Sequence, residues 1–172
     1  MKVLVTGEPG IGKTTLIKRL VERLKSRAIG FWTEEVRYKE TGKRRGFRIV
    51  TTEGKKKTFA SKTFTSRYLV GSYGVNLRYF EELALPVLER ALKERDKVIV
   101  IDEIGKMELF SKPFRELVRR IMYDPRLKVV ATIPIRDVHP LVAEIRRLPG
   151  AVLIEITKEN RDYMVEEVLK LI

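Results

Sequence analysis

The run GEPGIGKT, residues 7–14, constrains this chain more than any other part of the sequence. It follows the apolar segment Val3–Val5 and precedes a helical pattern, which is the strand, loop and helix context of the phosphate-binding motif G-x-x-x-x-G-K-[ST]. The glycines allow the backbone to turn tightly and to approach a phosphate without a side-chain clash. The main-chain N–H groups point at an anion from the positive end of a helix. We therefore expect residues 7–14 to bind the phosphates of a nucleotide.

Each residue of this loop is a candidate phosphate contact. The predicted contacts are Gly7, Glu8, Pro9, Gly10, Ile11, Gly12, Lys13 and Thr14. Lys13 can reach the β- and γ-phosphates, which also makes it a catalytic candidate. The hydroxyl group of Thr14 is a Mg²⁺ ligand in this motif, so Mg²⁺ is the expected cofactor.

The bulk composition favours a single domain. A chain of 172 residues with 44% hydrophobic residues can bury one sizeable core, so we expect one domain over residues 1–172. The absence of cysteine, of a leader and of a membrane-spanning stretch predicts a cytoplasmic protein without a membrane partner. The 34% of charged residues and the absence of cysteine and glutamine are typical of a thermophilic source.

Positive charge is concentrated in residues 31–67. The chain carries a formal net charge of +13, and this segment holds eleven Lys or Arg against four Glu, a balance of 11 − 4 = +7. Clustered basic charge binds nucleic acid with little sequence preference, so RNA or DNA contact is one interpretation. A solvated, soluble face is the other, and it is favoured because no aromatic and basic signature of nucleic-acid binding accompanies the charge.

Hydrophobic periodicity predicts an alternation of strands and helices. The expected core strands are 2–6, 29–38, 97–101, 128–133 and 151–156, and the expected helices are 13–26, 77–95, 111–123, 139–147 and 161–170. Pro86 predicts a kink or a break in the second helix. This alternation is typical of an α/β protein with a mostly parallel sheet and helices on both faces. Ligands of such sheets bind at the carboxyl ends of the strands, where the loop at residues 7–14 lies.

A different pattern interrupts this alternation. Residues 47–52 and 57–60 read as short strands separated by Glu53-Gly54, after a turn at Thr41-Gly42. We therefore expect an antiparallel β excursion over about residues 31–61.

A second motif follows the strand at 97–101, which ends in two adjacent carboxylates, Asp102 and Glu103. Asp102 can hold Mg²⁺ opposite Thr14. Glu103 lies one residue farther toward the γ-phosphate, where it can orient or deprotonate an attacking water. An acidic strand end is common on protein surfaces, but beside GEPGIGKT the pair predicts a hydrolytic site.

The run DEIGKMEL, residues 102–109, resembles the signature of a small nucleoside-triphosphatase family of thermophile type, whose vertebrate member is called cancer-related nucleoside-triphosphatase. Residues 31–34, 70–75 and 131–134 match as well, so the resemblance covers nearly the whole chain. It implies a RecA-like P-loop NTPase core and slow Mg²⁺-dependent hydrolysis of several nucleoside triphosphates to diphosphates. The family's nucleotide contacts would fall on residues 7–14 and on Asp102, Glu103, Gly105 and Lys106.

Other residues are weaker candidates. Lys106 follows a glycine at the active edge, so it can touch a phosphate or can be one surface lysine among many. An arginine finger is expected on mechanistic grounds, and Arg136 is preferred because it follows a core strand at its carboxyl end. Arg146, Arg147 or a partner molecule are the alternatives.

Base recognition has no clear motif. Thr157–Asn160 echoes a guanine-reading T-K-x-D sequence, but an Asn amide cannot replace the paired acceptance of Asp. A cap for the last helix is the simpler interpretation, and weak base selectivity is the prediction. Trp32, Tyr73 and Tyr79 can stack on a base, although packing is the favoured role for each.

Three functions remain open on the sequence. The preferred one is Mg²⁺-dependent hydrolysis of ATP, GTP and other nucleoside triphosphates to diphosphate and phosphate. The second is a nucleotide or small-molecule kinase, with residues 37–67 as an arginine-rich lid. The third is a nucleotide-gated module that binds nucleic acid through its basic segment. Nothing in the sequence indicates the oligomeric state.

Overall fold

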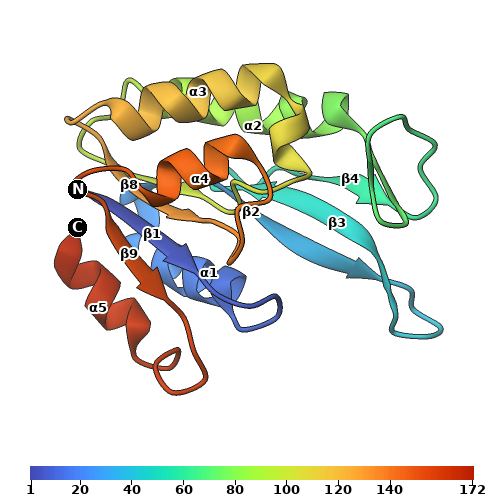
Figure 1. Cartoon of the computed structure of the whole chain (residues 1–172), viewed down its shortest axis with the longest axis horizontal. Helices are drawn as coiled ribbons and strands as arrows, with labels where there is room; N and C mark the ends of the chain where they lie inside the picture. The colour runs from blue at the N-terminus through green and yellow to red at the C-terminus, as the bar shows by residue number, and fades with distance from the viewer.

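The computed structural model describes all 172 residues and contains one nine-stranded sheet with helices on both faces (Figure 1). The strand order is β5-β6-β4-β3-β2-β7-β8-β1-β9. The strands are β1 Lys2–Thr6, β2 Ala28–Arg37, β3 Arg44–Thr51, β4 Lys56–Ser61, β5 Leu69–Val70, β6 Tyr73–Val75, β7 Val98–Ile101, β8 Lys128–Thr132 and β9 Val152–Glu155. The helices are α1 Lys13–Leu24, α2 Leu77–Ala91, α3 Lys112–Tyr123, α4 Pro140–Arg146 and α5 Met164–Leu171. None of these helices is both long enough and apolar enough to span a bilayer.

Five strands form the parallel core that the alternating pattern predicts. β2 pairs with β7, β7 with β8, β8 with β1, and β1 with β9, all in parallel. Every residue of β1 and β7 is buried, as expected for strands covered on both faces. The carboxyl ends of these strands therefore meet at one edge of the sheet, which is where the loop after β1 begins.

Two separate apolar cores cover the two faces of the sheet. The larger core packs α2, α3 and α4 against one face, and Phe31, Phe80 and Phe114 meet there with ring centroids 5.1 to 6.0 Å apart. The smaller core packs α1 and α5 against the other face. In Figure 1 these two groups of helices lie above and below the sheet. The fold is thus the three-layer α/β arrangement expected for a P-loop NTPase.

Strand β2 joins the parallel core to the antiparallel excursion. Its first part, Ala28–Phe31, pairs with β7, whereas Phe31–Arg37 pairs with β3 in the antiparallel sense. We call the second half of β2 together with β3, β4, β5 and β6 the β-arm. The β-arm projects beyond the helices in Figure 1. Because β2 is continuous, the arm starts at the edge of the sheet that carries the phosphate-binding loop.

The β-arm extends farther along the chain than the predicted 31–61. Strands β5 and β6 add residues up to Val75, and β6 pairs with β4. These strands have only two and three residues, which is too short for an alternating pattern to be recognised in the sequence. The pairing partner, and not the local sequence, makes them strands.

Two helical predictions were wrong in detail. Helix α2 runs without a break through Pro86 and ends at Ala91, four residues before the predicted 95. Burial of Ala84, Val87 and Leu88 on both sides of Pro86 offsets the hydrogen bond that proline removes. The final helix begins at Met164 rather than at 161, because turns occupy residues 158–163.

Asn160 does not cap that helix. Its side-chain oxygen accepts the backbone N–H of Thr157 at 2.8 Å, and its amide donates to the carbonyl of Glu155 at 2.9 Å. The residue instead closes the turn that follows β9. Asn160 is therefore a turn residue whose polar groups are already used by the backbone.

Candidate active site

The loop between β1 and α1 has the conformation that an anion site requires. Gly10 and Gly12 have φ values of 79° and 117°, in the left-handed region that a side chain would disfavour. Gly12 is also the N-cap of α1, and no side chain caps this helix. Its first N–H groups are thus left for a ligand, and the helix dipole adds to their attraction for an anion. Both effects favour phosphate.

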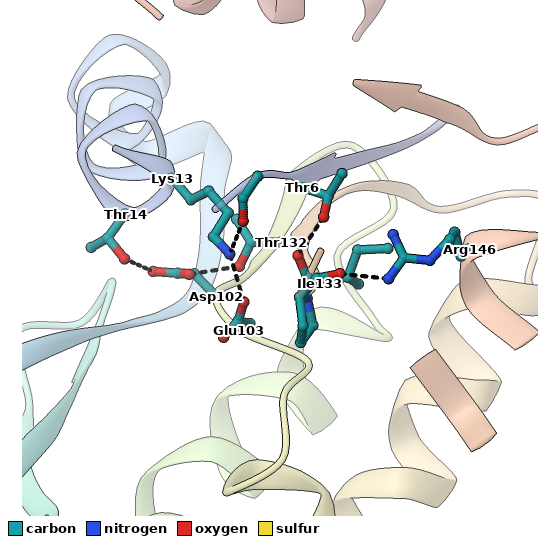
Figure 2. A network of polar contacts seen from close by, with 10 residues as sticks. Thr6, Lys13, Thr14, Asp102, Glu103, Thr132, Ile133 and Arg146 are labelled. Atoms are coloured by element: carbon teal, nitrogen blue, oxygen red, sulfur yellow. Dashed lines mark hydrogen bonds and ion pairs between the residues drawn. The ribbon is translucent and has the colours of Figure 1, made fainter. Parts of the chain in front are cut away.

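Lys13 lies over this loop. Its Nζ atom is 3.0 Å from the carbonyl oxygen of Gly7 and 3.2 Å from Oε2 of Glu103. Only 13% of the lysine side chain is exposed. Figure 2 shows Lys13 and Thr14 on one side facing Asp102 and Glu103 on the other. The structure therefore brings together the two motifs that the sequence separates.

Asp102 follows the last residue of β7 and is almost fully buried. Its Oδ2 accepts the hydroxyl of Thr14 at 2.8 Å, and its Oδ1 accepts the hydroxyl of Thr132 at 2.6 Å. Burial raises the pKa of Asp102 to about 6; the hydrogen bonds from Thr132, Thr14 and the backbone of Thr33 oppose this shift, and the charge of Glu103 adds to it. Two hydroxyl groups thus hold this carboxylate in one orientation.

These atoms fit a magnesium ion bound mainly through phosphates. A hydroxyl and a carboxylate oxygen lie side by side at the end of the loop, and both are hard oxygen ligands. No group of three or more His, Cys, Asp or Glu side chains forms an all-protein metal cage. Mg²⁺ is usually held by one or two protein oxygens together with substrate phosphates and water, and Thr14 and Asp102 would supply those oxygens.

A single cavity of about 830 Å³ connects these groups. The predicted site residues that line it are Gly7, Glu8, Pro9, Gly10, Gly12, Lys13, Thr14, Asp102, Glu103 and Arg136. Three predicted residues do not line it: Ile11 packs toward the apolar core under α1, and Gly105 and Lys106 lie past Glu103, with Lys106 exposed. The loop, the strand end and Arg136 therefore share one space.

Arg136 lies in the loop between β8 and α4, and two other arginines donate hydrogen bonds to this loop. Arg146 donates to Asp137 Oδ1 at 2.8 Å and to the carbonyl of Pro134, and Arg147 donates to Asp137 Oδ2 at 3.2 Å. Figure 2 shows Arg146 reaching toward this loop from α4. Arg146 and Arg147 are thus engaged outside the cavity, and of the three arginines considered as a finger only Arg136 lines it.

The β-arm supplies a cavity wall that the sequence did not reveal. The lining residues that the β-arm contributes are Thr33, Glu34, Glu35, Arg44, Phe47 and Arg48. Glu34 accepts from Lys18 of α1 at 2.8 Å and from Arg48 of β3 at 2.9 Å. This carboxylate therefore ties α1 to two strands of the β-arm. Trp32, Tyr73 and Tyr79 are not part of the cavity lining, which agrees with their favoured packing role.

Thr132 is another residue whose role the sequence did not reveal. It ends β8, the strand beside β7, and parallel strands end at the same edge of a sheet. That rule could have placed Thr132 next to Asp102. The run at 131–134 was noted only as a family match.

A phosphate-binding loop after β1, an aspartate at the end of β7, one strand away in the parallel sheet, and a three-layer fold define a P-loop nucleotide-binding protein. The NTPase family model matches residues 2–169. Nucleoside-triphosphatase THEP1 of Aquifex aeolicus is 73% identical over 100% of this chain and 99% of its own length. The human cancer-related nucleoside-triphosphatase is 41% identical over 97% of this chain and 94% of its own.

Solved structures agree with the sequence comparison. The crystal structure of THEP1 from Aquifex aeolicus superposes with a TM-score of 0.94 at 70% identity, covering 99% of this chain and 98% of that one. The solution structure of a human cancer-related nucleoside triphosphatase gives 0.82 at 40% identity, with 99% and 96% covered. The chain belongs to the NTPase family. The family resemblance and the P-loop NTPase fold are thereby confirmed.

Proposed function

We propose that this protein hydrolyses nucleoside triphosphates to diphosphate and phosphate, with Mg²⁺ as cofactor and little selectivity for the base. The observation that carries the proposal is the meeting of Lys13 and Thr14 with Glu103 and Asp102 at an uncapped helix start. The relatives named nucleoside-triphosphatase support the reaction type. The metal and the individual roles rest on the chemistry of these side chains.

The phosphates enter between the loop and Lys13. Backbone N–H groups and the lysine charge hold the β- and γ-phosphates. A triphosphate in this position competes with Glu103 for Lys13, so the carboxylate is released toward a water molecule. Thr14 and Asp102 would hold Mg²⁺, and the bound ion would neutralise charge on the phosphate oxygens.

Glu103 then acts as the general base. Water attacks the γ-phosphorus in line, the bond from this phosphorus to the β-phosphate oxygen breaks, and the proton of the water passes to the carboxylate. Arg136, on the cavity wall, is positioned to neutralise charge on the transferred group. The diphosphate and phosphate leave after Glu103 returns its proton to solvent.

Low base selectivity follows from the position of Asn160. Its side-chain oxygen and its amide are both bound to the backbone of the turn after β9. A residue whose polar groups are already satisfied offers little discrimination between bases. We therefore expect ATP and GTP to be hydrolysed with specificity constants within about tenfold of each other.

The substitution Glu103→Gln tests the proposal. It keeps the shape of the side chain but removes the base, so turnover should fall by about 10²- to 10⁴-fold. A non-hydrolysable ATP analogue should bind at least as tightly as to the unmodified protein, because Lys13 loses its competing partner. Full turnover in this variant would show that Glu103 is not the general base. Phosphate transfer to an acceptor in preference to water would favour the kinase alternative.

The remaining predictions concern nucleic-acid binding, cellular location and source organism. Several basic residues of the β-arm are paired with carboxylates, including Arg44 with Glu35 and Lys57 with Glu82. Such pairing favours a solvated face, and contact with RNA or DNA stays a prediction, to be tested by salt-dependent binding at low ionic strength. The cytoplasmic location and the thermophilic source also stay predictions.

A further inference from the structure

A second buried carboxyl group lies behind Glu103 and has no part in the mechanism above. Glu108, in the short 3-10 helix Glu108–Phe110, is only 5% exposed. It accepts hydrogen bonds from the backbone N–H groups of Gly105 and of Glu108 itself. Burial is the main cause that raises the pKa of Glu108 to about 8, and the nearby charges of Glu103 and Asp102 contribute to this rise. The group therefore carries a proton at neutral pH.

Gly105 stands between the two glutamates. A Cβ atom at this position would lie 3.0 Å from Oε1 of Glu103 and 3.0 Å from Oε1 of Glu108. Gly105 does not have a positive φ, so its backbone conformation suits any residue. A side chain here would therefore meet two carboxyl oxygens, which would have to shift by a few tenths of an ångström to make room.

The two oxygens of the Glu103 carboxylate have different surroundings. Its Oε2 faces the cavity, 3.2 Å from Nζ of Lys13, whereas its Oε1 faces the gap above Gly105. When a triphosphate withdraws Lys13, the contact on the cavity side is lost. The space above Gly105 then limits where the carboxylate can point. A base must lie within hydrogen-bond reach of its water, and a displacement of about 1 Å can cost roughly 10²-fold in rate.

We propose that Gly105 and Glu108 are positioning residues for Glu103: Gly105 leaves the gap that its carboxylate enters, and Glu108 closes the back of that gap. This inference rests on the proposed role of Glu103 as the base. Because Glu108 is protonated, it fills the space without placing a second negative charge behind the base. A charged neighbour would repel the Glu103 carboxylate and push it toward the cavity.

The substitution Gly105→Ala fills the gap. We expect kcat for ATP to fall by about tenfold, because the Glu103 carboxylate must shift by a few tenths of an ångström. The Kd of a non-hydrolysable ATP analogue should stay within about threefold, because the loop and Lys13 remain in place. Turnover at the level of the unmodified protein would overturn the role of Gly105. An equal loss of analogue binding would overturn it as well, since the residue would then serve binding rather than the base.

Two substitutions at Glu108 separate positioning from packing. Glu108→Gln keeps the size and the neutral polar group, so kcat should stay within about threefold of the unmodified protein. Glu108→Leu removes the acceptors for the two backbone N–H groups, and kcat should fall by about tenfold or more. Glu116→Gln, at an exposed position of α3, is the matched control for loss of a surface glutamate. Equal kcat values in the Gln and Leu variants would overturn the role of Glu108.

A double-substitution cycle shows whether the effect passes through Glu103. In the Glu103→Gln background, Gly105→Ala should cause no further loss of the residual rate, since no base remains to be displaced. A further loss of similar size would show that Gly105 acts elsewhere and would overturn the inference. If Glu103→Gln alone is fully active, the proposed base itself fails, and this outcome is distinct from an active Gly105→Ala variant beside an inactive Glu103→Gln.

Discussion

The hydroxyl oxygen of Thr14 lies 2.8 Å from Oδ2 of Asp102, although the two residues are 88 positions apart in the chain. One comes from the first turn of α1 and the other follows β7. β8 lies between β1 and β7, so the loop and the strand end meet across one intervening strand. Thr132, at the end of that strand, fixes the other carboxylate oxygen. The sheet order thus brings the two motifs together.

The substitution Asp102→Asn tests this pair. The amide keeps the volume but loses the charge that would hold Mg²⁺, so turnover at a fixed Mg²⁺ concentration should fall by about 10²-fold, and the Mg²⁺ concentration for half-maximal rate should rise. A Mg²⁺ titration of the hydrolysis rate measures both. Thr14→Ser, which keeps the hydroxyl group, is the control. If the Mg²⁺ concentration for half-maximal rate is unchanged in Asp102→Asn, Asp102 is not a metal ligand.

Arg136 is expected to act on the transferred phosphate. Arg136→Ala should lower kcat by about 10³-fold, the lower end of the effect of an arginine finger, with little change in KM. Steady-state kinetics with ATP measures the effect. Arg126→Ala is a suitable control, because Arg126 pairs with Asp124 away from the cavity. If Arg136→Ala keeps its rate while Arg44→Ala loses it, the group that stabilises the transition state belongs to the β-arm.

Glu34 is expected to stabilise the attachment of the β-arm to α1. Burial opposes its charge, but hydrogen bonds from Lys18, Arg48 and Trp32 outweigh burial and lower the pKa of Glu34. A carboxylate with a lowered folded-state pKa stabilises the fold above its unfolded value of 4.5, and this contribution disappears as the pH falls through the folded-state value. Glu34→Gln should therefore lower the Tm by a few degrees at pH 7 and by much less at pH 3.

Thermal unfolding followed by circular dichroism at both pH values checks this prediction. Glu35→Gln is the matched control, since the carboxylate of Glu35 is more exposed and pairs with Arg37 and Arg44 within the β-arm alone. Equal shifts in Tm at the two pH values would show that the charge of Glu34 contributes nothing.

The parts of the site that the sequence predicts are those governed by local rules. The residues of GEPGIGKT determine the conformation of the phosphate-binding loop by themselves. A buried strand followed by Asp102-Glu103 places both carboxylates at the carboxyl edge of a parallel sheet. The wall formed by Glu34 and Arg48 depends on the register between β2 and β3. Register across a long hairpin depends on pairing and turn geometry, which the alternation of residues does not specify uniquely. β5 and β6 were missed for a different reason, since strands of two and three residues are too short to show an alternating pattern.

The buried carboxyl of Glu108 predicts an unusual pH dependence of stability. Its pKa is raised from 4.5 in the unfolded chain to about 8 in the folded protein, mainly by burial. Between these values the folded state binds more protons at this group than the unfolded state, so this group makes stability fall as the pH rises. Above pH 8 the unfavourable contribution is complete. Glu108→Gln cannot ionise. The Tm of this variant minus the Tm of the unmodified protein should therefore increase as the pH rises from 5 to 8.

Differential scanning calorimetry of the two proteins across this range measures the difference directly. Glu116→Gln corrects for the general effect of removing one negative charge from a chain of net charge +13. A difference in Tm that stays constant from pH 5 to pH 8, once the control is subtracted, would show that Glu108 is already ionised in the folded protein. The same result would place a second negative charge behind Glu103, and the carboxylate of Glu103 would then face repulsion from the side on which Gly105 leaves it room.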